Sequence, residues 1–346
     1  MVGFNFCPWC GERLPPNSNF CPTCGERLTV VRRQKGGRRT SLLTLYGSWS
    51  SILMAFFLAA NVFLAFWMAP EISELLLTTG FPILASSLLP PFVFILVVLE
   101  GSAALVAYWF VLVAILISFI IMIWRSRDIS SELKGLRTED PSPLFAVTTV
   151  FSALLLVNIV YYFVIGSLGI EPNIPLSAGQ EEQIRLFSVL QAVVTEEIND
   201  RMILIGLPLA LLVLLGRKEG VAWKMPFGGM GLGRAELILI IFSSMIFALS
   251  HLEGWDVWKL IPTFISGLGL GYLFVRYGIH ASIMLHFCFN FLSAYMIYTG
   301  SLLAAVFTGL MIFYLLILGV PFLIIYTIRS IRATLTILSA NDKNAE

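Results

Sequence analysis

Charged residues are scarce in this chain. They make up 12% of its 346 residues, whereas 58% of the residues are hydrophobic and the mean hydropathy is +0.88; soluble domains carry roughly 25% charged residues. The few charges gather in short clusters between apolar runs of about 20 residues, the length that crosses a bilayer. A soluble fold is excluded, because a chain of this size could not bury so much apolar surface. The sequence predicts an integral membrane protein of many spans.

Several other features are also absent. The start of the chain is polar, so we do not expect a secretory signal, which needs an apolar core of about 7–15 residues. The formal net charge is only +1, and a nucleic-acid partner is therefore not expected. The sequence has no H-E-x-x-H motif, which excludes the mechanism of soluble zincins, and no G-x-S-x-G motif that would support a serine nucleophile.

Four of the five cysteines form two C-x-x-C pairs near the start, Cys7 with Cys10 and Cys21 with Cys24. Each pair lies in a C-P-x-C-G turn, and two such turns can complete a tetrahedral zinc site of four thiolates. We predict a zinc ribbon whose structural metal supplies the folding energy of this short segment. Two disulfides or a redox C-x-x-C are the alternatives, but the basic flank indicates the cytoplasm, where thiols stay reduced. Cys288 lies in an apolar segment and is predicted to be core.

The hydropathy pattern predicts an all-α bundle of about eight transmembrane helices. The segment 177–215 is expected to form one long helix with a polar, amphipathic front half. The stretch 71–91 is apolar but contains Gly80 and three prolines, and we expect a loop with interfacial or re-entrant pieces there. The expected spans are 42–68, 102–124, 144–168, 202–215, 235–250, 258–275, 279–298 and 302–328.

Lysine and arginine mark alternate loops. They lie before the first span, after the second (Arg125, Arg127), after the fourth (Arg217, Lys218) and after the last (Arg329), while the intervening loops hold mostly Glu and Asp. Cytoplasmic loops are enriched in Lys and Arg. An even number of spans then places both termini in the cytoplasm.

The fourth span carries charged residues in the sequence T-E-E-I-N-D-R, namely Glu196, Glu197, Asp200 and Arg201. Charges inside spans are costly and indicate function. Glu197 and Arg201 have the helical spacing and orientation that favour a salt bridge. Glu196 projects to a neighbouring face, and repulsion between two adjacent carboxylates in a poorly solvated site makes one of them suitable as a general base.

Two of the three histidines lie in later spans. Phe247 and His251 are one turn apart at the end of the fifth, and His286 and Asn290 lie on one face of the seventh. A His and an Asn on one apolar helix form a donor pair that could hold an oxyanion. The rise per residue places His251 near the outer end of its span and His286 nearer the inner end, so we expect different depths. The alternative is that each histidine only makes a polar contact between helices.

Three motifs, E-E-x-x-x-R, F-x-x-x-H and H-x-x-x-N, follow one another on separate spans between about residues 180 and 292. In this order they resemble the CPBP family of membrane proteins. That family includes CAAX prenyl endopeptidases of the Ras-converting type and bacterial bacteriocin-immunity (Abi) proteins. The residues that carry the resemblance are Glu196, Glu197, Arg201, Phe247, His251, His286 and Asn290.

The resemblance implies intramembrane peptide hydrolysis. Glu196 would be the general base for the attacking water, with His251 helping to hold that water. His286 and Asn290 would stabilise the oxyanion, and the salt-bridged pair of the first motif would brace its helix. Glu and His side chains can also ligate zinc, so a catalytic Zn stays an alternative to the metal-free Glu/His site that we favour.

The expected partners are the lipid bilayer and a protein or peptide substrate, lipidated or not. A non-catalytic immunity or scaffold protein, with the ribbon as docking module, is one alternative function. A proton-coupled transporter is another, but it would predict paired broken helices in two halves of the chain, and the sequence has no such repeat. The predicted segments are a zinc ribbon (1–30), a basic linker (31–41), N-terminal transmembrane helices (42–175), a CPBP-like protease core (176–330) and a polar C-terminal tail (331–346).

Overall fold

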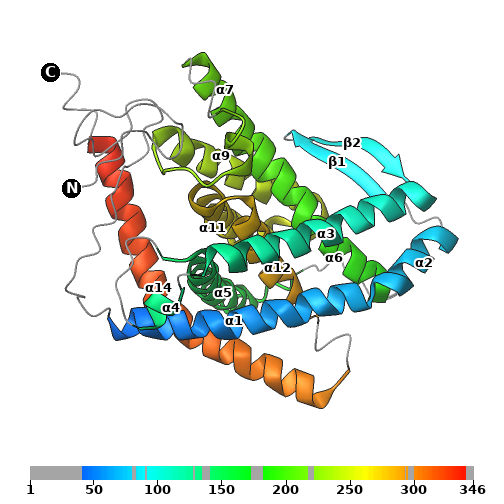
Figure 1. Cartoon of the computed structure of the whole chain (residues 1–346), viewed down its shortest axis with the longest axis horizontal. Coiled ribbons are helices and arrows are strands. Elements are labelled where there is room, and N and C mark those ends of the chain that lie inside the picture. Colours follow the sequence, from blue (N-terminus) through cyan, green and yellow to red (C-terminus); the bar gives the residue numbers. More distant parts are fainter. Residues whose placement is uncertain are drawn as a thin grey trace.

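The computed structural model describes residues 41–339 except 80–82, 90–91, 128, 135–140, 173–181, 217–221, 293 and 295–299. The predicted zinc ribbon and its four cysteines lie outside the described residues. The described part is a bundle of long helices with one small hairpin (Figure 1).

The described part of the chain begins with two consecutive helices, a hairpin and a third helix. Helix α1 (Leu42–Trp67) begins at Ser41, whose hydroxyl oxygen accepts a hydrogen bond from the Thr44 N–H, and is followed by α2 (Ala69–Thr79). An antiparallel hairpin of β1 (Ile83–Leu89) and β2 (Phe92–Leu99) leads into α3 (Gly101–Arg125).

The loop predicted for 71–91 is therefore wrong. Most of α2 and all of β1 lie within it, and β1 pairs with β2 in a register that runs from Ile83 opposite Leu99 to Leu89 opposite Phe92. The described elements contain neither Gly80 nor the three prolines, since α2 ends at Thr79, β1 covers Ile83–Leu89 and β2 begins at Phe92. A helix and a strand can therefore form on either side, because proline disrupts only the element that contains it.

Helix α5 begins inside the bundle and ends at its surface. After the short α4 (Ile129–Leu133), it runs from Pro143 to Ser167 and packs against α1, α11, α12 and α14. Its first thirteen residues, up to Leu155, are all buried. A stretch of helix that is apolar on every side is expected to lie in the interior, and this first part of α5 does, whereas later residues such as Phe163 are exposed.

The predicted long helix at 177–215 is confirmed from residue 182 onward, with one difference. Helix α6 (Glu182–Glu197) passes into a π-helical segment, η1 (Ile198–Gly206), and continues as α7 (Leu207–Leu215). The Leu207 N–H bonds to the carbonyl of Met202, five residues back. The wider turn shifts the side chains that follow it and commonly marks functional sites.

The second half of the bundle contains the helices that carry the two histidine motifs. Helix α9 (Arg234–Ser250) follows the 3-10 turn η2 (Met225–Phe227), and α10 (Leu252–Trp255) with η3 (Val257–Lys259) connects it to α11 (Leu260–Tyr277). Helix α12 (Ile279–Phe291) follows directly, and α14 (Leu302–Ser339) is the last. Since α14 continues to Ser339, helix extends into the segment predicted as a polar tail.

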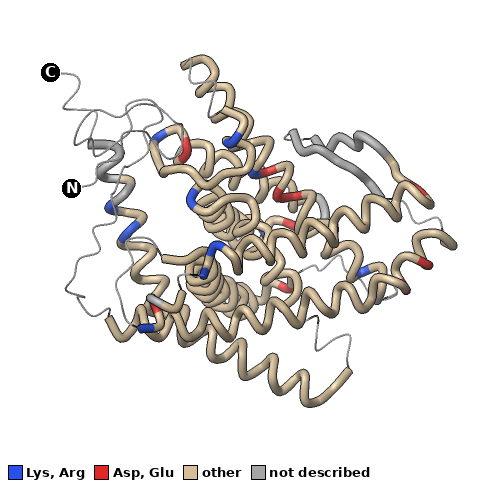
Figure 2. Tube along the Cα trace, viewed as in Figure 1, with Lys and Arg blue, Asp and Glu red and all other residues tan. Residues whose placement is uncertain are grey.

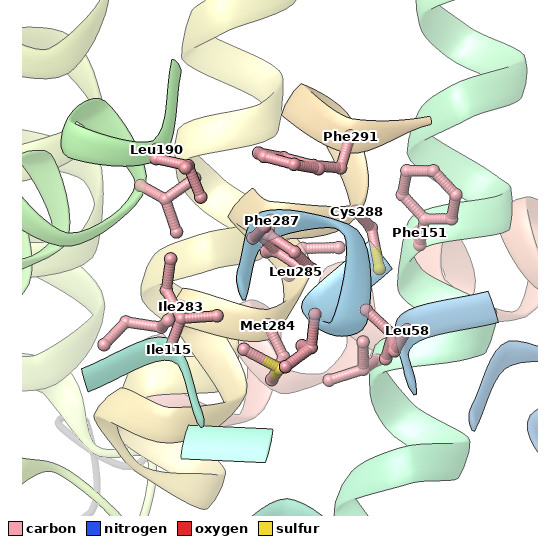
Figure 3. Close-up of a cluster of buried hydrophobic side chains, with 14 of the residues drawn as sticks. Leu58, Ile115, Phe151, Leu190, Ile283, Met284, Leu285, Phe287, Cys288 and Phe291 are labelled. Atoms are coloured by element: carbon pink, nitrogen blue, oxygen red, sulfur yellow. The ribbon is translucent and has the colours of Figure 1, made fainter. Parts of the chain in front are cut away.

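Helix α12 is the centre of the hydrophobic core. Its Met284, Leu285 and Phe287 are surrounded by side chains from α1, α3, α5 and α6, such as Leu58 and Phe151 (Figure 3). Cys288 is buried beside them, as predicted, with its Sγ 3.8 Å from the Met54 Sδ.

Six described helices are long and apolar enough to cross a membrane, and α9 and α12, with 17 and 13 residues, are shorter. Large apolar side chains such as Phe56, Phe63 and Phe163 project outward from them, each more than 60% exposed. Such a surface suits lipid rather than water. The predicted polytopic helical membrane bundle is confirmed.

Candidate active site

Three motif-bearing segments meet inside the bundle. The junction of α6 and η1 carries the glutamates and Arg201, the end of α9 carries Phe247 and His251, and α12 carries His286. Helix α9 packs against η1, and α12 packs against α6. Residues 196–201, 247–251 and 286 are thereby brought together from segments far apart in the sequence.

Glu197 is the most heavily bonded residue of the site. Its side chain is fully buried. One carboxylate oxygen lies 2.9 Å from the Nδ1 of His286, and the other lies 3.4 Å from the Nε of Arg201 and accepts a hydrogen bond from the Ser282 hydroxyl. The salt bridge predicted between Glu197 and Arg201 is confirmed. With three partners, this carboxylate is suited to holding α6, α12 and η1 together.

Glu196 has a different environment from its neighbour. Its side chain is 26% exposed, and its Oε2 lies 3.6 Å from the Nε2 of His286. That separation exceeds the usual hydrogen-bond limit of about 3.2 Å. His286 therefore stands between the two glutamates, bonded to Glu197 through Nδ1 and facing Glu196 with Nε2. Glu196 is the more accessible carboxylate.

Arg201 is fully buried, and its Nε and Nη2 have no hydrogen-bond partner among the described residues. Its Nη1 donates to the Ser243 hydroxyl oxygen at 2.6 Å, and that hydroxyl donates to the backbone carbonyl of Asp200 at 2.5 Å. The guanidinium carbon lies 5.1 Å from the ring centroid of Phe247, within the range of a cation–π contact. Together these contacts fasten η1 to α9.

Asp200 is also fully buried, and neither of its carboxylate oxygens has a hydrogen-bond partner among the described residues. It interacts electrostatically with Glu196, Glu197, Arg201 and His286. Asp200 is therefore part of the charged cluster, although none of the three motifs includes it.

His251 and His286 are both neighbours of Phe247. The ring centroids of Phe247 and His251 are 4.8 Å apart, and those of Phe247 and His286 are 6.0 Å apart. The expectation of different depths is therefore wrong, because both histidine rings lie next to the same phenylalanine. The Nδ1 of His251 lies 2.7 Å from the Phe247 carbonyl. A carbonyl can only accept, so Nδ1 carries the hydrogen and Nε2 is left as an acceptor.

Asn290 is placed differently from the other motif residues. Its side-chain amide donates to the backbone carbonyl of Val189 at 3.0 Å and so ties α12 to α6. An amide nitrogen has two hydrogens, and the second is available to another acceptor. The expected donor pair of His286 and Asn290 lies on α12 as predicted, with one Asn290 hydrogen already bonded within the protein.

Two serines of the site, Ser243 and Ser282, were not predicted from the sequence. Ser243 precedes Phe247 by four residues, and Ser282 precedes His286 by four. Residues four apart share a helix face. The signal was thus present in two motifs: a serine one turn before Phe247 and another one turn before His286, each on an otherwise apolar helix.

The described residues bring no group of three or more His, Cys, Asp and Glu side chains into a metal-binding arrangement. Glu197 and the Nδ1 of His286 already bind each other, which leaves Glu196 and the Nε2 atoms of the two histidines. These three donors match the usual number of protein ligands to catalytic zinc, but the described residues do not bring them into a metal-binding arrangement.

Comparison with known protein families gives two matches. Residues 183–292, from α6 through α12, match the family model described as type II CAAX prenyl endopeptidase, Rce1-like. Residues 6–28 match a zinc-ribbon domain. No curated protein and no solved structure matches the chain. The chain thus combines an N-terminal zinc-ribbon domain with a membrane bundle that, over about a third of the sequence, is similar to the Rce1-like CAAX prenyl endopeptidases.

Proposed function

We propose that this protein is an intramembrane endopeptidase in which Glu196 activates the attacking water. The observation that carries the proposal is the contrast between the two neighbouring glutamates. Glu197 is fully buried and bonded to His286, Arg201 and Ser282. Glu196 is partly exposed, faces the Nε2 of His286 at 3.6 Å and interacts electrostatically with His251. The similarity to a peptidase family over the same residues supports this assignment.

The proposed reaction needs only groups of this site and one water. Glu196 accepts a proton from the water as its oxygen attacks the carbonyl carbon of the peptide bond, with the Nε2 of His251 accepting the water's other hydrogen in a hydrogen bond. His286 carries a hydrogen on each ring nitrogen in this step, so that Nδ1 donates to Glu197 and Nε2 donates to the negative oxygen that forms. The unbonded amide hydrogen of Asn290 also stabilises that oxygen. The C–N bond then breaks, and the proton held by Glu196 passes to the leaving amine.

The remaining motif residues act as supports in this proposal. Glu197 fixes the ring of His286 so that Nε2 faces Glu196, in the way that a partner on one ring nitrogen sets the role of the other. Arg201 neutralises Glu197 and is held by Ser243. The site therefore has a rigid inner part and a single reactive carboxylate at its accessible edge.

The test is peptide cleavage by purified protein in liposomes. Glu196→Gln keeps the shape of the side chain but removes the base, and we expect kcat to fall by at least about 100-fold, the lower end of what a general base contributes. Glu100→Gln is the matched control, because Glu100 is an exposed residue at the start of α3 with no side-chain capping bond. Cleavage that survives Glu196→Gln at the wild-type rate would contradict the assignment.

We further propose that the N-terminal cysteines, Cys7, Cys10, Cys21 and Cys24, bind one structural zinc ion and that the ribbon serves as a docking module. Their doubled C-x-x-C spacing and the zinc-ribbon match support this. Both termini are assigned to the cytoplasm on the distribution of Lys and Arg. The substrate is a membrane-associated protein or peptide, and no feature of the described residues requires it to be lipidated.

A further inference from the structure

A lysine that no motif includes lies beside the candidate site. Lys259 ends the short turn η3, which connects α10 to α11 and follows His251 closely in the sequence. It interacts electrostatically with both Glu196 and His251. A positive charge is thus placed at the accessible edge of the site, where the proposed water would be activated.

Two indole rings hold the Lys259 side chain. Its Nζ lies 4.0 Å from the ring centroid of Trp255 and 5.4 Å from that of Trp258. Both distances are within the range of cation–π contacts. Among the described side chains, no carboxylate lies within ion-pair distance of Lys259. The ammonium group contacts the two indole rings instead.

The two indole rings that contact Lys259 are held in place by residues of α5. The backbone carbonyl of Trp258 accepts a hydrogen bond of 2.7 Å from the Tyr161 hydroxyl, and the Trp258 ring lies 5.5 Å from that of Tyr162. Trp255 packs edge-on against Trp258 at 6.0 Å. These contacts fix the two indole rings, and the rings in turn restrict the position of the Lys259 ammonium group.

A half-buried ammonium without a carboxylate is incompletely stabilised. Aromatic faces offset only part of the cost of removing the charge from water. A carboxylate delivered by a ligand would complete the pair, and it would do so next to Glu196. Glu196 itself is not within ion-pair distance, which leaves it free to act on water.

We propose that Lys259 is a specificity-determining residue that binds a carboxylate of the peptide substrate close to the bond that is cut. This inference rests on the proposed endopeptidase function and adds the substrate class: peptides with a negative group near the scissile bond. The carboxylate has two sources, an Asp or Glu side chain or the free C-terminus of the peptide. The chemistry of binding is the same for both.

The cleavage experiment compares matched pairs of quenched fluorescent peptides that each contain an apolar segment. One pair differs only in a free C-terminal carboxylate against a carboxamide, and the other only in Glu against Gln near the cut. Each pair is measured with wild type, Lys259→Met, Lys259→Arg and the control Lys224→Met. Lys224 is also half-buried and also lies over an indole, 5.5 Å from the Trp223 centroid, but outside the site.

We expect wild type to prefer the charged member of at least one pair by about tenfold or more in kcat/KM, mostly through KM, as one charge-assisted hydrogen bond would give. The pair that shows the preference identifies the source of the carboxylate. Lys259→Met should reduce the ratio to about one, Lys259→Arg should keep most of it, and Lys224→Met should leave it unchanged. An unchanged ratio in Lys259→Met, or no preference in wild type for either pair, overturns the proposal.

A binding measurement separates this inference from the proposed catalysis. Fluorescence anisotropy measures how tightly Glu196→Gln and Glu196→Gln/Lys259→Met bind the same peptides. It therefore tests the role of Lys259 in binding without any cleavage. Tighter binding of the charged peptide that is lost in the double variant supports the carboxylate site even if no peptide is cut. Equal binding of charged and uncharged peptides by Glu196→Gln rejects it. A residue that merely anchors the helix end at the membrane surface would change stability and leave both ratios alone.

Discussion

At the scale of single residues, Glu196 and Glu197 are neighbours on one helix but lie in different surroundings. Neighbouring positions on a helix point in directions about 100° apart, so Glu197 enters the core towards α12 while Glu196 reaches the accessible edge. Burial requires Glu197 to have partners, and it has three. A local difference in direction thus becomes a difference in chemical role.

Replacing Glu197 should therefore affect folding as well as activity. Glu197→Gln leaves the buried guanidinium of Arg201 without its counter-charge, a loss that typically costs about 3–5 kcal/mol. Glu196→Gln removes a partly exposed charge and should change stability much less. Thermal unfolding in detergent, followed by tryptophan fluorescence, should show a clearly lower Tm for Glu197→Gln alone.

A second variant makes the cause of that loss visible. Replacing the pair together, as Glu197→Gln/Arg201→Met, removes the uncompensated charge and should recover part of the lost Tm. Equal midpoints for Glu196→Gln and Glu197→Gln would show that the two carboxylates do not differ as their contacts indicate.

The sequence could predict the local part of this site. The Glu197–Arg201 pair lies within one helix, where the spacing alone decides which side chains meet. The bonds of Ser243 to Arg201 and of Ser282 to Glu197 join separate helices. They depend on how α9 and α12 are rotated and how deeply they lie, which periodicity does not determine.

At the scale of elements, the helices were predictable and their local departures from regularity were not. Apolar length located the spans, because the bilayer fixes how long an apolar helix must be. The π-helical turns of η1 pack against α9 and η2, and the sequence pattern gave no sign of them. The hairpin β1–β2 was missed because apolar runs of this length fit a strand as well as a membrane segment.

Close approach of two helices depends on one glycine. A Cβ added at Gly319 of α14 would overlap the backbone carbonyl of Ser152 in α5, and small residues of this kind allow membrane helices to pack closely. Gly319→Ala should force α14 away from α5 and lower the stability by about 1–3 kcal/mol, the usual cost of overpacking.

The control for that change lies on the same helix. Gly309 faces open space, with nothing within 4 Å of an added Cβ, so Gly309→Ala should leave Tm unchanged or raise it slightly through helix propensity. Thermal unfolding of both variants in one detergent checks the pair. A similar Tm for both would mean that α5 and α14 do not approach as closely as their backbones indicate.

At the scale of the whole molecule, acidic and basic residues are distributed unevenly between the two ends of the bundle. Figure 2 shows the acidic residues of α2 and of the start of α3 towards one end, while many of the basic residues lie towards the end where α3 and α14 finish. This is the asymmetry that the positive-inside rule uses. The proposal that both termini lie in the cytoplasm rests on this asymmetry, and a ribbon located there would keep its cysteines reduced and able to bind zinc.

We expect the ribbon to require zinc and the membrane site to work without a metal. Purified wild-type protein should contain one zinc ion per chain by elemental analysis, because four thiolates complete one tetrahedral site. A variant with Cys7, Cys10, Cys21 and Cys24 all replaced by Ser should contain none. Since the proposed membrane site works through Glu196 and water, this variant should still cleave peptide, and a chelator should not change its rate. Loss of its cleavage to the chelator, with recovery on adding Zn²⁺, would instead assign the water-activating role to a catalytic metal held at the edge of the site.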